Sequence, residues 1–390
     1  MQTTTTISLK RLAIVLTHPI QYYSPVFKSL SKNCDLKVFY TLGKHVRDLK
    51  YDHGFKKSVV WDIPLLDGYS YVFEENISKQ PGDHHFSGVK NNTLIEDITD
   101  FNPDAVLIYG WAYHSHLKAI RHFKGKVPIW FRGDSTLIDN RSFIKKTVRK
   151  IFLYWVYKHI DIVFYPGSAS KRYFKACGLK ESQLIFAPHA IDNERFSTDR
   201  HLDTIEIRRN FSIKEQEILI LFAGKLEPKK NPFLLLRVFK ELHRSDVHLL
   251  FVGNGILEDA LKEQSVDFKD RIHFMDFQNQ SKMPAIYQSA DLYCLPSKGP
   301  GETWGLAVNE AMASGKSVIV SDKVGAAEDL VQKQNGLIFK SEQPEELREK
   351  LNSLLEKRRL KEMGLSSKNI IKNWTIERQV SIITESLNAE

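Results

Sequence analysis

Short apolar runs alternate with amphipathic stretches along most of the 390-residue chain. Apolar runs that end in turn or capping residues are typical of buried strands in parallel sheets, and the stretches between them have helical periodicity. In the first half we expect strands at 12–16, 36–40, 105–109, 128–131, 162–165 and 184–187. Ser24-Pro25 predicts a helix start, with Ser24 as the N-cap and proline in the first turn. This order predicts a doubly wound α/β domain.

The alternation stops after residues 188–192, where a polar stretch runs through Asp203, and then restarts. In the second half we expect strands at 218–222, 248–252, 272–275, 292–295, 317–320 and 337–339. Asn231-Pro232 marks another helix start. We therefore predict two Rossmann-like domains, residues 1–197 and 203–365. Such folds bind ligands at the carboxyl ends of their strands.

Composition narrows the class of protein. A hydrophobic content of 42% in 390 residues is ample for two cores. The three cysteines, Cys34, Cys177 and Cys294, lie far apart and suggest neither a disulfide framework nor a zinc site. The chain opens with polar residues and has no apolar segment long enough to span a bilayer, so we expect a soluble protein of the reducing cytoplasm. The net charge of +9 favours an anionic partner, which could be nucleic acid, a membrane or a phosphorylated small molecule.

The most informative segment is a glycine-bearing loop, 299–305, that runs into a predicted helix. The first amides of that helix, at about Gly305 and Leu306, and the helix dipole suit a diphosphate. Glu302 lies in the loop and Glu310 about two turns into the helix, so the two carboxylates suit the hydroxyls of two sugars. The alternative is that Glu310 is a solvated helix residue and the glycines only form a turn, and the spacing alone does not decide between the two.

A second loop, 223–231, follows another predicted strand and carries Lys225 and Lys230. Lysines beside a diphosphate neutralise the ligand and the charge that grows on a leaving group. By itself this loop is better explained as a solvated basic turn. Together with the loop at 299–305 it favours an anion site.

Four segments, in this order, resemble the retaining GT-B glycosyltransferases of glycosyltransferase family four: Gly224-Lys225-x4-Lys230, Val252-Gly253-Asn254-Gly255, Ala290-Asp291-Leu292 with Leu295-Pro296-Ser297, and Glu302-x7-Glu310 with Ala311-Met312-Ala313-Ser314-Gly315. The resemblance implies a GT-B fold of two Rossmann-like domains that face each other across a cleft. It also implies roles: Glu302 contacts the donor sugar, Glu310 binds the ribose, Lys225 and Lys230 hold the diphosphate, and about Phe277 borders the base. The same segments supply further donor-site candidates, namely Gly224, Gly253, Asn254, Ser297, Thr303, Trp304, Gly305 and Leu306. The chain departs from the pattern with Lys225 in place of arginine and Asn231 in place of glycine.

The resemblance also implies a mechanism. In this family the leaving phosphate helps to deprotonate the acceptor on the front face, so that the anomeric configuration is retained and no protein nucleophile is needed. Glu302 is then an orienting group. The chain contains no Asp-x-Asp pair, so we expect no metal and no other cofactor, with a nucleotide-diphosphate sugar as the substrate. The family further suggests surface polysaccharide biosynthesis and a C-terminal helix, at about 366–390, that crosses back to the first domain.

Acceptor-side candidates come from the first half. His18 and Gln21 follow the strand at 12–16, although that loop lacks the glycines many family members carry. Arg132 and Asp134 follow the strand at 128–131, and they either bind phosphate and an acceptor hydroxyl or form an ion pair that braces the loop. His114 and His116 follow the strand at 105–109, and they either face the cleft or are structural. We interpret His189 as a domain-junction residue.

The stretch from Arg141 to Ile160 is cationic and amphipathic. It either lies on an anionic membrane surface, which would suggest a lipid-linked acceptor and a peripheral position on the inner face of the membrane, or packs on the sheet with its lysines solvated. Other classes fit less well. The class of nicotinamide oxidoreductases is disfavoured because the third glycine of the dinucleotide-binding fingerprint is missing after Gly253-Asn254-Gly255. A nucleic-acid binder is disfavoured because acidic residues are interspersed, whereas a nucleotide-sugar epimerase of the same fold remains an alternative.

Overall fold

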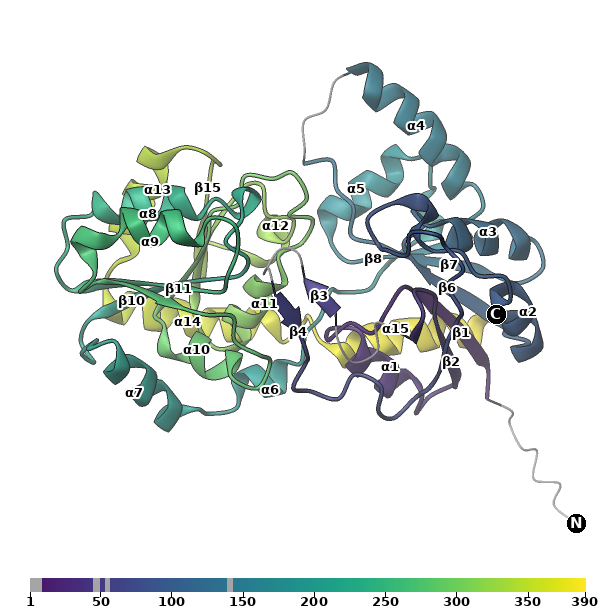
Figure 1. The fold of residues 1–390 in the computed structure, drawn as a ribbon, viewed down its shortest axis with the longest axis horizontal. Helices are drawn as coiled ribbons and strands as arrows, with labels where there is room; N and C mark the ends of the chain where they lie inside the picture. The colour runs from purple at the N-terminus through teal and green to yellow at the C-terminus, as the bar shows by residue number, and fades with distance from the viewer. Residues whose placement is uncertain (1–8, 45–49, 53–56, 139–142) are drawn as a thin grey trace, which may run out of the picture.

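The computed structural model describes residues 9–44, 50–52, 57–138 and 143–390, and of 50–52, 57–59 and 143–148 only the backbone. Two α/β halves lie side by side, and the chain's last helix, α15 (Ile376–Ala389), lies on the N-terminal half (Figure 1). Each half is a parallel sheet covered by helices on both faces, as the alternation of apolar runs and amphipathic stretches predicts.

The N-terminal half contains a seven-stranded parallel sheet in the order β5-β2-β1-β6-β7-β8-β9. Its strands are β1 (Arg11–Leu16), β2 (Asp35–Tyr40), β5 (Ser70–Phe73), β6 (Ala105–Tyr109), β7 (Ile129–Arg132), β8 (Ile162–Tyr165) and β9 (Leu184–Phe186). Its helices are α1 (Ser24–Leu30), α2 (Leu94–Phe101), α3 (His114–Phe123), α4 (Phe143–Tyr157) and α5 (Ser168–Ala176), with short 3-10 turns at Phe86–Gly88 and Glu181–Gln183. A small antiparallel hairpin, β3 (Lys50–Asp52) and β4 (Lys57–Val59), precedes β5.

The C-terminal half contains a six-stranded parallel sheet in the order β12-β11-β10-β13-β14-β15. Its strands are β10 (Ile218–Ala223), β11 (Val247–Val252), β12 (Ile272–Met275), β13 (Leu292–Leu295), β14 (Ser317–Ser321) and β15 (Gly336–Phe339). The helices are α6 (Asn193–Ser197), α7 (His201–Asn210), α8 (Pro232–Lys240), α9 (Glu258–Gln264), α10 (Met283–Ser289), α11 (Leu306–Ala313), α12 (Ala327–Leu330), α13 (Pro344–Leu354) and α14 (Lys357–Ile371), with 3-10 turns at Pro228–Lys230 and Val266–Phe268. In both sheets the strand order reverses beside the first strand, between β1 and β6 and between β10 and β13.

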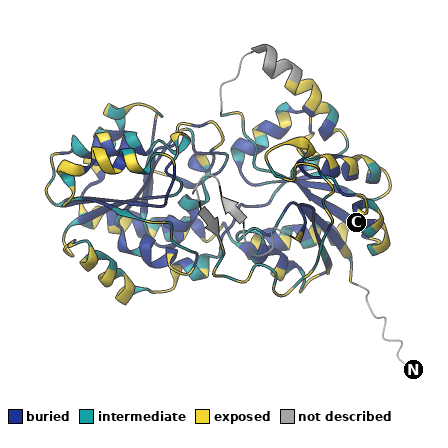
Figure 2. Cartoon of the chain, viewed as in Figure 1, coloured by how far each residue is buried: buried dark blue, intermediate teal, exposed yellow. Residues whose placement is uncertain are grey.

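Both faces of each sheet are buried, so successive residues along a strand belong to different cores. Ile14 of β1 packs in one cluster of the N-terminal half and Val15 in the cluster on the other face. In the C-terminal half, Ile220 and Leu221 of β10 are divided in the same way. Figure 2 shows the buried colour concentrated on the two sheets and on the inner sides of the helices. The apolar runs are therefore continuous rather than alternating, which is why they could be recognised in the sequence.

Every strand expected from the sequence is present, with ends that differ by at most one residue, whereas β3, β4 and β5 were not predicted. Strand β5 is an edge strand with half-exposed side chains, so it lacks the buried apolar run of the others. The prediction of Ser24 as an N-cap was wrong. Tyr23 occupies that position, and the Ser24 hydroxyl donates instead to the carbonyl of Ile20 at 3.1 Å, across the turn that precedes α1.

The chain returns to the N-terminal half through α15. This helix buries Ile376, Val380, Ile383 and Leu387 in a core cluster of that half and packs against α1. Residues 366–371, which we expected to belong to the crossing helix, are part of α14, and α14 packs against α11 and β14 of the C-terminal half. The Thr375 side chain caps α15 by accepting from the amide of Arg378 at 3.2 Å.

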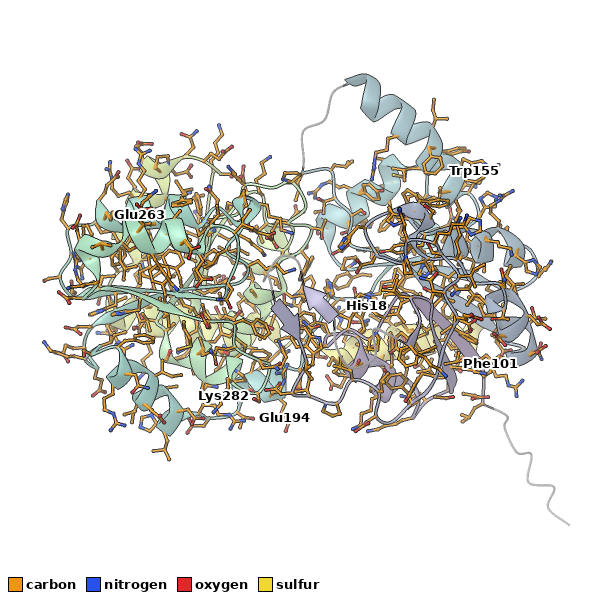
Figure 3. All side chains as sticks on the ribbon, in the orientation of Figure 1. His18, Phe101, Trp155, Glu194, Glu263 and Lys282 are labelled. Atoms are coloured by element: carbon orange, nitrogen blue, oxygen red, sulfur yellow. The ribbon has the colours of Figure 1, made fainter. Side chains whose placement is uncertain are left out.

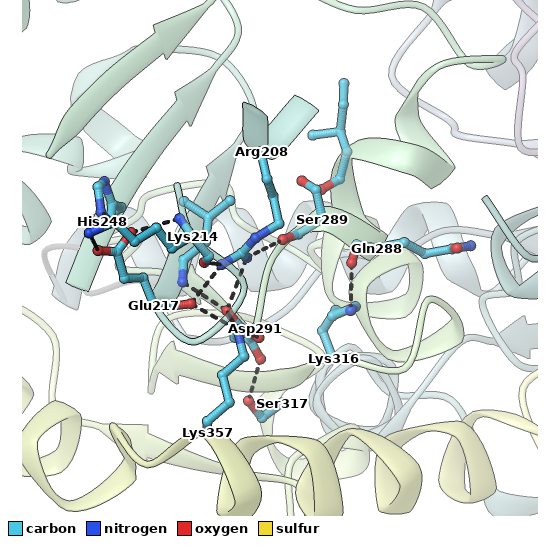
Figure 4. Close-up of polar contacts among 12 residues, drawn as sticks. Arg208, Lys214, Glu217, His248, Gln288, Ser289, Asp291, Lys316, Ser317 and Lys357 are labelled. Atoms are coloured by element: carbon cyan, nitrogen blue, oxygen red, sulfur yellow. Dashed lines mark hydrogen bonds and ion pairs between the residues drawn. The ribbon is translucent and has the colours of Figure 1, made fainter. Parts of the chain in front are cut away.

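A network of ionic and hydrogen-bonding groups ties α7 and α14 to the amino-terminal edge of the second sheet (Figure 4). Asp291, directly before β13, accepts from Arg208 at 3.3 Å, from Lys357 at 3.0 Å and from the amide of Leu219 at 2.9 Å. Three donors around one carboxylate fix this end of the sheet. The network lies at the amino ends of β10 and β13. Asp291 therefore stabilises the fold and lies at the opposite end of the strands from the loops at their carboxyl ends.

Candidate active site between the two domains

A cavity of about 750 Å³ lies between the two halves, at the carboxyl ends of both sheets. Its walls come from the loops after β1, β10, β11, β12 and β13, together with residues 60–67 of the N-terminal half. His18, in the loop after β1, lies on the side of the N-terminal half that faces the C-terminal half (Figure 3). The cavity therefore lies where both strand orders reverse, the position at which doubly wound sheets bind their ligands.

Glu302 is held in a buried ionic contact on the C-terminal wall. Its Oε2 lies 2.5 Å from Nζ of Lys230 and accepts a 3.0 Å hydrogen bond from Ser297. The carboxylate is only 7% exposed, so its charge needs these partners. Ser297 itself does not line the cavity, and it acts by holding Glu302.

Glu310 lies deeper, on α11, and is hydrogen-bonded by both halves of the protein. Its Oε1 accepts from the hydroxyl of Tyr22 at 3.0 Å, and its Oε2 accepts from Tyr287 at 2.7 Å. Burial raises the pKa of this carboxyl above its ordinary value, while the two tyrosine donors act in the opposite direction. Glu302 and Glu310 both line the cavity, so the alternative that Glu310 is a solvated helix residue was wrong.

The lysine-bearing loop after β10 forms another part of the same wall. Lys225, Lys229 and Lys230 line the cavity along with Gly224. The loop ends at Asn231, whose φ of 53° lies in the left-handed region. Asparagine is one of the few residues other than glycine that adopts this conformation readily, which explains how it replaces the glycine usual in the family.

The N-terminus of α11 lies on the same wall of the cavity. Gly305 is the N-cap with a φ of 92°, a conformation that favours glycine, and α11 begins at Leu306. Thr303, Trp304, Gly305 and Leu306, which we named as donor-site candidates, all line the cavity. Lysine ammonium groups and the positive end of a helix dipole thus face one space.

The loops after β11 and β12 form the far end of the cavity, where Gly253 and Phe277 contribute to the lining. Asn254 is not part of the lining. Its Oδ1 accepts from the amide of Phe277 at 2.8 Å, and its Nδ2 donates to Asp276 at 3.0 Å. Asn254 therefore positions the loop that carries Phe277.

The N-terminal wall carries His18, Gln21 and Asp134. Asp134 accepts a 2.7 Å hydrogen bond from the hydroxyl of Thr303, so a carboxylate of one half and a hydroxyl of the other meet at the cavity. Arg132 does not reach the cavity. Its guanidinium is buried and donates at 3.1 Å to the carbonyls of Ala187 and Pro188, so neither phosphate binding nor the expected pairing with Asp134 describes it.

Histidines divide between structural and cleft positions. His114 lies on α3, in a separate cavity of about 370 Å³, outside the interdomain site. His116 is buried, with Nδ1 2.8 Å from the carbonyl of Gly110 and Nε2 2.8 Å from the hydroxyl of Thr41, and burial lowers its pKa to about 4. His189 lines the interdomain cavity and stacks on Tyr23 at a centroid distance of 6.0 Å.

Two parts of the site were missed in the sequence. Tyr22 lies in the loop after β1 that we singled out for His18 and Gln21, but nothing in the pattern connected it with Glu310. Residues 60–67 line the cavity from the N-terminal half, and Trp61 forms a ring pair with Phe277. This segment carries no motif and no regular periodicity, so the sequence offered no signal that it reaches the cavity.

Further contacts set the spacing of the halves. Ser168 donates to Asp329 through its amide at 2.8 Å and its hydroxyl at 2.6 Å. Asn309 of α11 donates to the carbonyl of His189 at 2.9 Å. The cavity therefore belongs to an interface that is hydrogen-bonded in several places.

The cationic stretch from Arg141 to Ile160 partly fits both packing on the sheet and exposure to a membrane surface. Residues 139–142 lie outside the described residues. On α4, Leu153 and Tyr157 are buried in a core cluster of the sheet, whereas Ile151, Phe152 and Tyr154 are 68%, 41% and 58% exposed. Figure 3 shows Trp155 at the outer part of the N-terminal half. Among the described residues, no helix is long and apolar enough to cross a membrane.

Two doubly wound parallel domains that face each other across a cavity at their strand ends define the GT-B class of fold. The model of the family described as glycosyl transferases group 1 matches residues 203–373, and this part of the chain belongs to that family.

Curated relatives match segments of the chain. A D-inositol 3-phosphate glycosyltransferase of Nocardia farcinica is 29% identical over 200 residues, which is 48% of this chain and 43% of the relative. A GDP-mannose-dependent monoacylated alpha-(1-6)-phosphatidylinositol monomannoside mannosyltransferase of Corynebacterium glutamicum is 25% identical over 240 residues, 59% of this chain and 63% of the relative. The chain thus spans less than two thirds of the length of these relatives.

Solved structures agree along the whole chain. The complex of Anabaena Alr3699/HepE with UDP and glucose superimposes with a TM-score of 0.72, at 16% identity, over 98% of this chain and 100% of that one. WaaG, a glycosyltransferase involved in lipopolysaccharide biosynthesis, superimposes with a TM-score of 0.67, at 13% identity, over 97% of this chain and 100% of that one. At these identities the likeness concerns the fold.

Proposed function

We propose that this protein is a glycosyltransferase that moves a sugar from a nucleotide-diphosphate donor to a saccharide or lipid-linked acceptor. The observation that carries the proposal is the pairing of Glu302 with Lys230 in the interdomain cavity, beside the N-terminus of α11 and with Glu310 deeper on that helix. A cationic region flanked by two carboxylates suits a diphosphate with a sugar on either side.

In this proposal the diphosphate lies against the first amides of α11 and the ammonium groups of Lys225 and Lys230. Glu302 orients the hydroxyls of the transferred sugar, and Glu310 accepts from the ribose hydroxyls. The bond between the anomeric carbon and the diphosphate oxygen breaks while the acceptor oxygen bonds to the same carbon. The acceptor oxygen approaches on the same face that the diphosphate leaves, so the configuration is retained. The acceptor proton passes to the leaving phosphate. The lysines and the helix end stabilise the growing charge on that phosphate more than the ground state.

We further propose that the reaction needs no divalent metal, because these cationic groups take the place of a cation at the diphosphate. Turnover should then be the same in the presence of a chelator such as EDTA as in the presence of Mg²⁺ or Mn²⁺. Loss of turnover in EDTA that Mg²⁺ restores would contradict this part of the proposal.

We also propose the class of acceptor. A relative named as a phosphatidylinositol monomannoside mannosyltransferase, and a structural neighbour involved in lipopolysaccharide biosynthesis, favour a lipid-linked or surface-polysaccharide acceptor. The exposed Ile151, Phe152 and Tyr154, beside Arg149 and Lys150, favour peripheral contact with an anionic membrane. Co-sedimentation with vesicles containing phosphatidylglycerol, compared with phosphatidylcholine alone, tests that contact. Equal binding to both, or to neither, would contradict it.

Calorimetry with UDP, GDP and ADP, in the absence of metal, tests the central proposal. One nucleoside diphosphate should bind with micromolar affinity, and Glu310→Ala should weaken it. The matching sugar nucleotide should then be consumed only when a saccharide or lipid-linked acceptor is present, and the product's anomeric proton should show the donor's configuration. Conversion of the donor without an acceptor would indicate an epimerase, and salt-sensitive oligonucleotide binding without nucleotide binding would indicate a nucleic-acid binder.

A further inference from the structure

A short segment of the N-terminal half, residues 60–67 between β4 and β5, reaches across the cavity to the loop after β12. The side-chain amide of Asn279 donates to the carbonyl of Val60 at 2.6 Å. The amide of Ser281 lies 3.2 Å from the carboxylate of Asp62, and the Ser281 hydroxyl donates to the same carboxylate. These contacts hold the segment against the second domain at the far end of the cavity.

Between these contacts, Trp61 meets Phe277. The two ring centroids are 6.1 Å apart and the ring planes are inclined at 68°, so the pair forms a corner. Both residues line the cavity and both are only partly buried. Because aromatic rings are usually well buried in a core, two half-exposed rings that face a cavity offer surface for a flat ligand.

The distribution of charge along the cavity suggests which part of a ligand this corner receives. The lysines belong to the loop after β10, in the middle of the sheet, whereas Phe277 follows β12 at the sheet edge. Two strand spacings separate these loops, roughly 10 Å. At the β12 end, the lining residues of the second domain are Phe277, Gln278 and Gln280, which carry a ring and amides in place of charges.

We infer that Trp61 is a nucleobase-binding residue, which forms one wall of the base site while Phe277 forms the other. The inference rests on the proposed function, since it assumes a nucleotide donor whose diphosphate lies at the lysines. It adds that base recognition is shared between the two halves, with the contact of Asp62 to Ser281 keeping the Trp61 ring in position. Any nucleobase can stack on an aromatic ring. The stacking is strong enough that loss of one ring lowers affinity about tenfold or more.

The test compares a whole nucleotide with its phosphate part. Binding of UDP, GDP, ADP and inorganic pyrophosphate is measured by calorimetry on the wild type, Trp61→Ala, Trp61→Phe and Asp62→Ala. Trp61→Ala should weaken the tightest nucleoside diphosphate about tenfold and leave pyrophosphate within twofold, because pyrophosphate uses only the lysines and the helix end. Trp61→Phe should lie between the wild type and Trp61→Ala, and Asp62→Ala should weaken the nucleotide but not pyrophosphate.

Two controls separate base binding from a structural role. Phe86→Ala removes another partly exposed ring of the N-terminal half, outside the interdomain cavity, and should bind all ligands as the wild type does. Tryptophan fluorescence should change when nucleotide binds to the wild type, and that change should be reduced in Trp61→Phe. If Trp61→Ala and Trp61→Phe bind the nucleotide as tightly as the wild type, the inference is overturned and the proposed function stands. If the wild type binds none of the nucleotides, both are overturned.

Discussion

The hydroxyl of Tyr22 donates a 3.0 Å hydrogen bond to Glu310, which joins the first loop of the N-terminal half to the first turns of α11. Tyr287, from the C-terminal half, donates to the other oxygen of the same carboxylate at 2.7 Å. The charge on Glu310 is therefore satisfied by one tyrosine from each half. Any ligand hydroxyl that reaches Glu310 joins a site whose geometry depends on both halves being in place.

Replacement of Glu310 by glutamine tests the role of its charge. The amide keeps the size of the side chain, and hydrogen bonds to a charged acceptor are stronger than those to a neutral one, so nucleoside diphosphate affinity should fall about tenfold. Pyrophosphate, which lacks the ribose, should bind Glu310→Gln as it binds the wild type, and calorimetry measures both. Equal losses for the two ligands would show that Glu310 acts on the diphosphate or on the fold, and not on the ribose.

Lys230 has two predicted effects, because its ammonium group both neutralises Glu302 and faces the cavity. Lys230→Met should lower turnover about a hundredfold, the usual cost of losing one group that stabilises developing charge. It should also lower the free energy of unfolding, since it leaves a buried carboxylate without its cation. Steady-state kinetics and urea unfolding measure the two effects.

Lys350→Met is the matched control for Lys230→Met. Lys350 pairs with Glu346 one turn away on α13, far from the cavity, with its side chain 30% exposed. Turnover should be unchanged, and the free energy of unfolding should change by less than about 1 kcal/mol. A similar loss of turnover in both variants would mean that Lys230 acts through overall stability or net charge.

The hydrogen bond from Thr303 to Asp134 connects the two walls of the cavity at 2.7 Å. Thr303→Val and Asp134→Asn should each lower kcat/KM for transfer, and the double variant should be little worse than either one, with a coupling of about 1 to 2 kcal/mol in a double-mutant cycle. Ser168→Ala is the control because it removes an interdomain hydrogen bond outside the cavity lining. It should lower stability without lowering kcat/KM, and additive effects of Thr303→Val and Asp134→Asn would argue against a functional bridge.

Acid should destabilise the protein partly through His116. Burial lowers the pKa of this imidazole from 6.5 to about 4, so between these values the unfolded chain binds more protons than the folded one. Its contribution is present in full above pH 6.5 and is lost as the pH falls toward 4, by at most about 3 kcal/mol. His116→Asn keeps a donor for the Gly110 carbonyl but cannot take up this proton.

Urea unfolding between pH 7.5 and 5 measures the effect at His116. The wild type should lose about 2 kcal/mol more over this range than His116→Asn, whatever their difference at pH 7.5. The same substitution at the exposed His201 on α7 should leave the wild-type pH dependence in place. Parallel pH curves for the wild type and His116→Asn would contradict the assignment.

Most of the fold could be predicted from the pattern of residues. A strand buried on both faces must be apolar throughout, so runs such as Ile162–Tyr165 and Leu292–Leu295 were located to the residue. Strand β5 could not be found in this way because it is half-exposed at a sheet edge. The lysine loop and the loop before α11 could be recognised because turn chemistry and strand position are local properties of the chain.

The acceptor side was predicted less well, and for a different reason. Arg132 and Asp134 are two residues apart, yet one side chain turns inward to the carbonyls of Ala187 and Pro188 while the other reaches Thr303 across the cavity. Which of the two faces the ligand depends on what the neighbouring segments offer as partners. No local pattern contains that information.

The sequence by itself determined the buried strands of the two sheets and the cationic character of the loop after β10, because each follows from burial, turn geometry and charge within a few residues. Only the tertiary structure decided that Tyr22 meets Glu310, that Thr303 meets Asp134 and that Trp61 meets Phe277. Each of these pairs joins residues more than 160 positions apart, from opposite halves. Their meeting depends on how two separately formed domains pack against each other, and that packing is set by many contacts that no short stretch of sequence encodes.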